Sequence, residues 1–409
     1  MKTQALAVLA VLAALTLCWP RDQFIAAAAA SDWAPTSANI ARGAYLARAG
    51  DCALCHTARG GAAYAGGRAL ATPFGTLYSP NLTSDAATGL GRWSADDFWG
   101  ALHNGRGRDG RYLYPAFPFP HFTRTTRADS DALYAYLHGL PAVNRPNRAH
   151  ALSFPFNTQA ALAAWRLLFF RPGVFEAAPA RSARWNRGAY LVEGLGHCGA
   201  CHGGRNAFGA SAAGLQGGLM PGSNWYAPAL GSSLPQRELV QLLQTGTTPR
   251  AAVSGPMADV VANSLQYLSA GDLDAIAAYL ATLPAAAPAP ASPAPDAASM
   301  AAGRKLYAQH CAACHGSDGA GRAPAYAPLA GSGAATMALP VNALSIVLQG
   351  GFAPGTAGNP RPYGMPPFAH VLADEEVAQV LTYVRNSWGN HAGAVTAAQA
   401  NARRGGALE

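Results

Sequence analysis

The chain has 409 residues, with 29 lysines and arginines against 21 acidic residues, and its formal net charge is +8. This length is sufficient for about three domains. No run of five or more lysines and arginines occurs, so the positive charge gives no support for nucleic-acid binding.

The first 30 residues have the composition of a secretory signal peptide. One lysine precedes an apolar run, and the alanines from Ala26 to Ala30 supply small residues for a cleavage site. We expect residues 1–30 to be removed and the mature chain to be periplasmic, with a retained anchor as the alternative. Leu17 precedes Cys18 where a lipoprotein would need a small residue, so we interpret Cys18 as part of the discarded signal.

Two cysteines three residues apart, followed directly by a histidine, occur three times in the chain. The six cysteines are Cys52, Cys55, Cys198, Cys201, Cys311 and Cys314, and the three histidines are His56, His202 and His315. This C-x-x-C-H pattern is typical of c-type haem attachment, in which the thiols form thioethers and the imidazole binds the iron as proximal ligand.

Two other interpretations of the motif fit the surrounding sequence poorly. A zinc site would need a second Cys or His pair about 12–20 residues further on, and none follows. A thioredoxin-like dithiol would need a βαβ context, and no strand-rich pattern surrounds these pairs. We therefore predict three covalently bound haems c.

The chain also repeats itself around the three motifs. A short helical segment with Gly43, Gly188 or Gly303 precedes each motif, and these glycines permit the close approach of a second backbone. Each unit ends in an amphipathic segment with acidic residues in its first turn, namely DSDALYAYLHGLP, SAGDLDAIAAYLATLP and LADEEVAQVLTYVRNSWG. A first helix that crosses a last helix over a haem resembles the class I cytochrome c fold.

These repeats predict a mainly α chain of three tandem class I cytochrome c-like domains, each with one haem. We expect domain 1 at 31–143, a helical connector at 144–179, domain 2 at 180–284, a Pro/Ala linker at 285–298, domain 3 at 299–391 and a tail at 392–409. Alternating Pro and Ala give a semi-rigid spacer, so domain 3 should be the most loosely placed.

Each proximal histidine leaves one further axial position on its iron. Met257 and Met365 each lie in a loop just before the last helix of their unit, so we predict them as distal ligands. The first unit has no methionine in the corresponding loop. His121 is our candidate there, an open iron is the alternative, and His103 is expected on a helix surface.

With these motifs and the segments LYSPNLT, LYPAFPF, FPFN, GPMADVV and VRNSWGN, the chain resembles a known family. This family is the three-haem cytochrome c subunits of bacterial membrane-associated dehydrogenases, which serve quinoprotein alcohol dehydrogenase and the flavin-dependent gluconate, sorbitol, fructose and glucose dehydrogenases. The resemblance implies Met257 and Met365 as distal ligands. Family members carry a methionine where Phe117 or Thr125 stands here. Some members also end in a membrane-binding helix, whereas this tail is short and weakly apolar.

The resemblance implies an electron-transfer subunit without a catalytic substrate site of its own. A catalytic subunit with FAD or PQQ would oxidise an alcohol or sugar at the periplasmic face of the inner membrane. The haems would then pass electrons to ubiquinone or a terminal oxidase. One alternative is the cytochrome subunit of a molybdenum-dependent aldehyde or N-heterocycle dehydrogenase. Another is a multihaem peroxidase-like enzyme, which would use an open first iron.

Overall fold

The computed structural model describes residues 31, 33–212, 214–220, 222, 225–231, 234–285 and 294–404. The predicted signal peptide, most of the predicted linker and the last five residues lie outside this part of the chain. Most elements of the described part are helices, and its sheets are small and antiparallel, which confirms the predicted mainly α class. No helix within it has the length and apolar character needed to cross a membrane.

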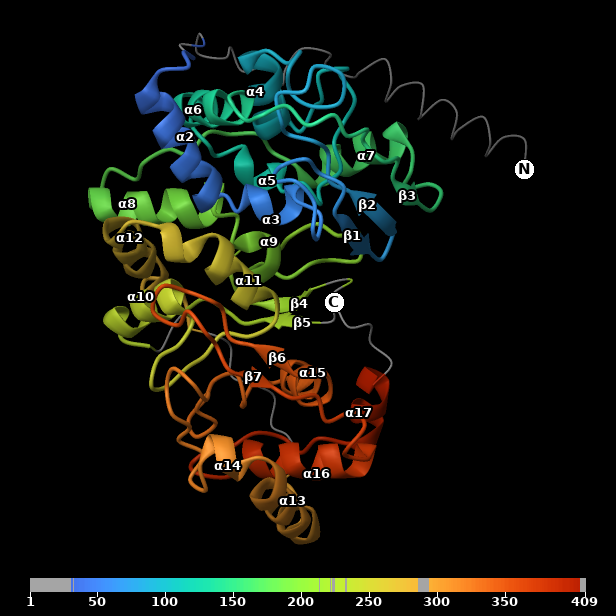
Figure 1. Cartoon of the computed structure of the whole chain (residues 1–409), viewed down its shortest axis with the longest axis vertical. Helices are drawn as coiled ribbons and strands as arrows, with labels where there is room; N and C mark the ends of the chain where they lie inside the picture. Colours follow the sequence, from blue (N-terminus) through green and yellow to red (C-terminus); the bar gives the residue numbers. More distant parts are fainter. Residues whose placement is uncertain are drawn as a thin grey trace.

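The elements form three successive units along the chain (Figure 1). The first unit contains α2 (Ser37–Ala49), α3 (Cys52–His56), β1 (Ala69–Thr72), β2 (Gly75–Tyr78), α4 (Ala95–Asn104), α5 (Phe119–Phe122) and α6 (Arg127–His138). It is followed by β3 (Ala151–Leu152) and α7 (Gln159–Phe169). Strand β3 pairs with β2, so the three strands form one sheet in the order β1-β2-β3.

The second and third units repeat the arrangement with different loops. The second contains α8 (Ala183–Tyr190), the π-helix η1 (Leu191–Leu195), α9 (Gly199–His202), β4 (Gly218–Met220), β5 (Trp225–Ala227), α10 (Gln236–Thr245), α11 (Pro256–Asn263), the 3₁₀-helix η2 (Leu265–Tyr267) and α12 (Ala270–Leu280). The third contains α13 (Ala297–His310), α14 (Ala312–His315), α15 (Val341–Gln349), β6 (Gly351–Phe352), β7 (Gly364–Met365), α16 (Asp374–Arg385) and α17 (Ala397–Arg404).

A crossing of the first and last helix occurs in each unit, and a glycine lies at each crossing point. A Cβ atom on Gly43, Gly188 or Gly303 would overlap a backbone oxygen of the opposite helix. It would also lie 2.7, 2.9 or 2.8 Å from the Cβ atom of Tyr136, Tyr279 or Tyr383, respectively. Real Cβ atoms essentially never come this close to a backbone or side-chain atom, so only glycine allows these helices to touch. The structure thereby confirms the close approach expected from the sequence.

The first two units share one hydrophobic core, whereas the third has its own. The shared core joins buried residues of both units, including Leu46, Leu133, Leu191 and Leu273. The core of the third unit is built from α13, α15, α16 and α17, with Leu344, Val377 and Ala400 fully or almost fully buried. The first two units are therefore one packed body.

A reciprocal pair of tyrosine contacts, here called the tyrosine exchange, joins the first two units. Tyr45 of α2 donates its hydroxyl to Asp272 Oδ2 at 2.6 Å. Tyr190 of α8 donates in the opposite direction, to Asp129 Oδ2 at 2.5 Å. In each case the aspartate lies in the last helix of the other unit. Each unit therefore supplies a hydroxyl that donates a hydrogen bond to the aspartate of the other unit.

An arginine from its own unit completes the environment of each aspartate in the exchange. Arg42 donates to Asp129 at 2.8 Å, and Arg187 makes two hydrogen bonds to Asp272, at 2.8 and 2.7 Å. In the third unit Tyr307 donates instead to the Gly316 carbonyl of that same unit, at 2.6 Å.

The third unit meets the second through hydrogen bonds from α15 and a nearby loop. The Asn342 side chain pairs with the backbone N–H and C=O of Tyr226, both at 2.8 Å. Gln266 donates to the Gly355 carbonyl at 3.2 Å and accepts from Ala357 N–H at 3.3 Å. In Figure 1 the third unit accordingly lies below the second, far from the first.

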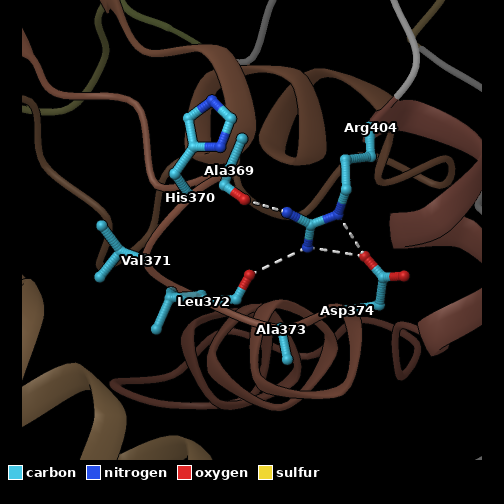
Figure 2. Close-up of a pocket in the computed structure, with 7 residues that line it drawn as sticks. All are labelled: Ala369, His370, Val371, Leu372, Ala373, Asp374 and Arg404. Atoms are coloured by element: carbon cyan, nitrogen blue, oxygen red, sulfur yellow. Dashed lines mark hydrogen bonds and ion pairs between the residues drawn. The ribbon is translucent and has the colours of Figure 1, made fainter.

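Helix α17 closes the third unit at the end of the described chain. Figure 2 shows the Arg404 guanidinium at the centre of this contact, where it donates to the carbonyl oxygens of Ala369 and Leu372 and to the Asp374 carboxylate. Ala400 is completely buried against α16. The predicted tail thus contains a helix that packs on its own unit.

Candidate haem-attachment sites

Each C-x-x-C-H motif lies on a short helix directly after the first long helix of its unit. These helices are α3, α9 and α14, and none of the six motif cysteines is in a disulfide. The crossing glycines hold the last helix of each unit against the helix that leads into the motif. The packing of the first helix of each unit against its last helix therefore positions the two cysteines of the motif.

The three motif histidines are oriented in the same way. Their Nδ1 atoms lie 2.8, 2.6 and 2.8 Å from the backbone oxygens of Pro80, Pro228 and Ala327, in chain order. A carbonyl can only accept, so Nδ1 carries the proton and Nε2 keeps a free lone pair. Burial also lowers the pKa of all three imidazoles, which favours the neutral form that binds iron.

The surroundings of the thiols argue against the two other interpretations of the motif. Burial raises the pKa of Cys52 and Cys198 to about 12 and that of Cys311 to about 11. A reactive dithiol needs a thiolate, which this burial disfavours. In addition, no group of three or more His, Cys, Asp or Glu side chains within the described ranges is arranged to hold a metal ion. The donor set fits a haem held by two thioethers and one imidazole.

The first two motifs lie close together in space. Cys201 contributes to the raised pKa of Cys55, after the larger effects of burial and Asp51. Asp51, directly before the first motif, is buried in turn, and its pKa is raised to about 8 by burial and by Asp259 of α11. Each of these two motifs thus adjoins the other unit, and Figure 1 shows α3 and α9 facing the boundary between the units.

Two arginines that sequence reasoning missed support the backbone of these motifs. Arg68 donates to the carbonyl of Leu54 at 2.9 Å, and Arg205 donates to that of Ala200 at 2.7 Å. Both carbonyls belong to the residue just before the second cysteine of a motif. The two arginines stand at different distances from their motifs along the chain, so no spacing rule would have identified them as a pair.

The predicted distal methionines are both half-buried and precede the last helix of their units, but they lie on short regular elements and not in the expected loops. Met257 is the second residue of α11 and packs against the shared core. Met365 lies on β7, where it pairs with Gly351 of β6. Their ligation of the second and third irons stays a prediction.

The backbone pairing of the first unit aligns Phe117 with Met257. Tyr112 bridges Arg106 just as Ala252 bridges Thr247, and Phe117 and Met257 each follow the bridge by five residues. The register of the first two units therefore leads to Phe117, one of the two positions that the family resemblance indicated.

His121 makes its contacts with the second unit. Its Nδ1 atom lies 3.3 Å from the backbone oxygen of Glu193, and a Cβ on Gly199 would lie 2.7 Å from its Cε1. The Nε2 atom is buried without a hydrogen-bond partner in the described part of the chain. Burial, with a smaller effect from His197, lowers the pKa of His121 to about 4. The ring thus borders the second motif, and its predicted role at the first iron stays a prediction.

The expectation that His103 lies on a helix surface is wrong. The residue is 3% exposed, its Nδ1 lies 2.8 Å from the Thr123 carbonyl oxygen, and its ring stacks on Trp99 at 4.5 Å. The chain that follows α5 folds back over α4 and covers this face. Local sequence gives no sign of such a covering segment.

The fold and these sites define a c-type cytochrome. In agreement, the cytochrome c family model matches residues 40–141 and 300–388. The chain is 39% identical over 390 residues to the cytochrome c subunit of alcohol dehydrogenase (quinone) from Gluconacetobacter polyoxogenes, covering 88% of this chain and 83% of the relative. It is 39% identical over 401 residues to the gluconate 2-dehydrogenase cytochrome c subunit from Pantoea cypripedii, covering 91% and 90%. The chain belongs to this family of dehydrogenase cytochrome c subunits.

A third relative is much longer than this chain. It is a subunit of nicotinate dehydrogenase from Pseudomonas putida, and it is 44% identical over 368 residues, which cover 86% of this chain but 30% of the relative.

Proposed function

We propose that the chain is a three-haem electron-transfer subunit, with one haem c in each of three cytochrome c domains at 31–143, 180–284 and 299–391. The observation that carries this proposal is the threefold repetition of one arrangement. In each unit a histidine whose Nδ1 atom contacts a backbone carbonyl follows two cysteines that form no disulfide, next to a helix pair that crosses at a glycine.

The residues of the chain have distinct roles in this function. The thiols fix each haem covalently, and the carbonyls of Pro80, Pro228 and Ala327 keep each proximal imidazole in one tautomer and orientation. The apolar cores exclude water from the sites, and Met257 and Met365 serve as distal ligands of the second and third irons. The haem itself supplies reversible one-electron chemistry at its iron.

We further propose that the electrons come from a separate catalytic subunit with FAD or PQQ that oxidises a sugar or an alcohol. The alcohol and gluconate dehydrogenase relatives support this assignment. The chain would work at the periplasmic face of the inner membrane, after removal of residues 1–30, and would deliver electrons to ubiquinone or a terminal oxidase. In this scheme the chain is not itself an enzyme.

A second candidate partner is a molybdenum-dependent dehydrogenase of aldehydes or N-heterocycles. The 44% identity to the nicotinate dehydrogenase relative favours it, because nicotinate is an N-heterocycle. Purification of the tagged chain from its native membrane, followed by identification of the catalytic subunit that it retains, separates the two candidates. Haem reduction by sugars or alcohols supports the first, whereas reduction only by N-heterocycles or aldehydes contradicts it.

The mature chain is expected to carry three haems. Intact mass spectrometry after denaturation should show three haem increments, because thioethers survive unfolding, on a chain that lacks residues 1–30. Cys201→Ala together with Cys198→Ala should remove one increment and leave two. A fully matured wild-type chain with two increments would contradict the proposal.

Met257→His and Met365→His are each expected to remove part of the weak far-red band that a thioether ligand gives to ferric haem. Each should also lower one midpoint potential, since a second imidazole stabilises the ferric state relative to methionine. Absorption spectra and a redox titration measure both effects. Met337→His serves as the control, because Met337 lies outside the loops that precede the last helices, and it should change neither. An unchanged spectrum in Met257→His or Met365→His would rule out that residue as a ligand.

A further inference from the structure

The first unit differs from the other two at one position of its distal loop. Phe117 occupies the place that Met257 has in the second unit, five residues after the bridging pair of the hairpin. Counting back from the last helix places Phe117 in the same range as the two methionines. Phe117 precedes the N-cap Thr126 by nine residues, whereas Met257 precedes the N-cap Ser269 by twelve and Met365 precedes the N-cap Ala373 by eight.

The loop around Phe117 is fixed, and its ring is packed inward. The backbone N–H of Phe117 donates to the Tyr114 carbonyl at 3.0 Å, and the Phe117 carbonyl accepts from the N–H of Phe119 at 2.7 Å. The ring lies 5.3 Å from that of Phe122 and packs against the shared core. A phenyl ring in this place has no lone pair to give to an iron.

The other candidate side chains of this unit lie elsewhere or are chemically unsuited. His103 stacks on Trp99 of its own helix, and His121 borders the second motif, where its Nε2 atom has no partner within the described chain. Thr125 is completely buried, and its hydroxyl has no partner within the described chain. This hydroxyl offers a hydrogen bond, but it is a weak ligand compared with a thioether or an imidazole.

We propose that the first haem iron has no protein ligand on its distal side and that it binds small neutral ligands, such as carbon monoxide or nitric oxide, next to the phenyl ring of Phe117. This inference rests on the proposed function, because it requires a haem at His56. It makes the first haem a ligand-binding centre within an electron-transfer chain, and an apolar neighbour such as Phe117 favours neutral diatomic ligands over anions.

The test is a titration of the reduced, intact protein with carbon monoxide, after mass spectrometry has counted its haems. We expect rapid binding of one carbon monoxide for every three haems. Phe117→Met should abolish this binding and increase the far-red band of the ferric protein by about half, as the number of methionine-ligated haems rises from two to three. Phe122→Met, the same substitution in the neighbouring ring, should retain the binding.

The outcomes separate this inference from the function on which it rests. A chain with only two haems would contradict the proposed function itself. Three haems with no rapid carbon monoxide binding would overturn the inference alone. If His121→Ala is needed before carbon monoxide can bind, then His121 is the distal ligand, as the sequence first indicated, and the open iron is disproved. Unchanged rapid binding in His121→Ala supports the open iron.

Discussion

Replacing Gly188 by alanine is expected to be one of the most damaging single changes in this protein, although it adds only a methyl group. The new Cβ would overlap the carbonyl oxygen of Ala275 and lie 2.9 Å from the Cβ of Tyr279. Because backbone atoms cannot step aside as a flexible side chain can, α8 and α12 must separate. We expect a loss of about 3 kcal/mol in the free energy of unfolding, measured by thermal or chemical denaturation.

Gly100→Ala is the matched control for this prediction. Gly100 lies within α4, and the nearest atom to an added Cβ would be 3.9 Å away. Since alanine is a better helix former than glycine, this change should stabilise the protein by about 0.5–1 kcal/mol or leave it unaffected. Equal losses in both variants would show that the glycine crossing is not what makes Gly188 necessary.

Asp272→Ala is expected to have the second large effect, because it leaves Arg187 and the hydroxyl of Tyr45 without their acceptor. The aspartate side chain is 12% exposed and Arg187 is 36% exposed, so solvent moderates the cost. We expect the free energy of unfolding to fall by about 2–3 kcal/mol. Tyr45→Phe should cost about 1 kcal/mol alone and less when added to Asp272→Ala, because only the contacts of the hydroxyl with Ser269 are then left to lose; a double-mutant cycle measures this difference.

The pH dependence of this contact has a definite sign. Burial alone would raise the pKa of Asp272, but the hydrogen bonds from Arg187 and Tyr45 outweigh it and lower the pKa below its usual value. The contribution of the carboxylate is therefore complete above the ordinary carboxyl range and is lost as the pH falls through the lowered pKa. Glu238→Ala, which removes the ion-pair partner of the exposed Arg250, should leave the stability almost unchanged.

The local parts of these sites could be predicted from the sequence, because each consists of residues that are adjacent in the chain. A thiol pair with its histidine spans five positions, and the helix that leads into it shows its own periodicity and cap. The crossing glycines were also predictable, since a glycine at the same place in three repeats marks a close approach of two backbones. Each of these features depends on a short segment, so it can be recognised from residues that are adjacent in the sequence.

The relation between units could not be predicted in this way. Tyr45 and Asp272 are 227 residues apart, and neither differs in type from an ordinary surface residue of an amphipathic helix. The contact of His121 with Gly199 and the burial of His103 have the same cause, because each depends on a segment that is distant in sequence or folds back from a loop. Only three-dimensional packing decides which of several equivalent helix faces is covered.

The tyrosine exchange also determines how many units can associate in the same manner. In symmetry terms it is an isologous interface, in which two equivalent surfaces each satisfy the other, and such an interface closes on itself at two members. The third unit joins through different surfaces, with Asn342 meeting the backbone of Tyr226, and this contact is heterologous. The chain thus combines a closed pair with a third unit that is attached through a different surface.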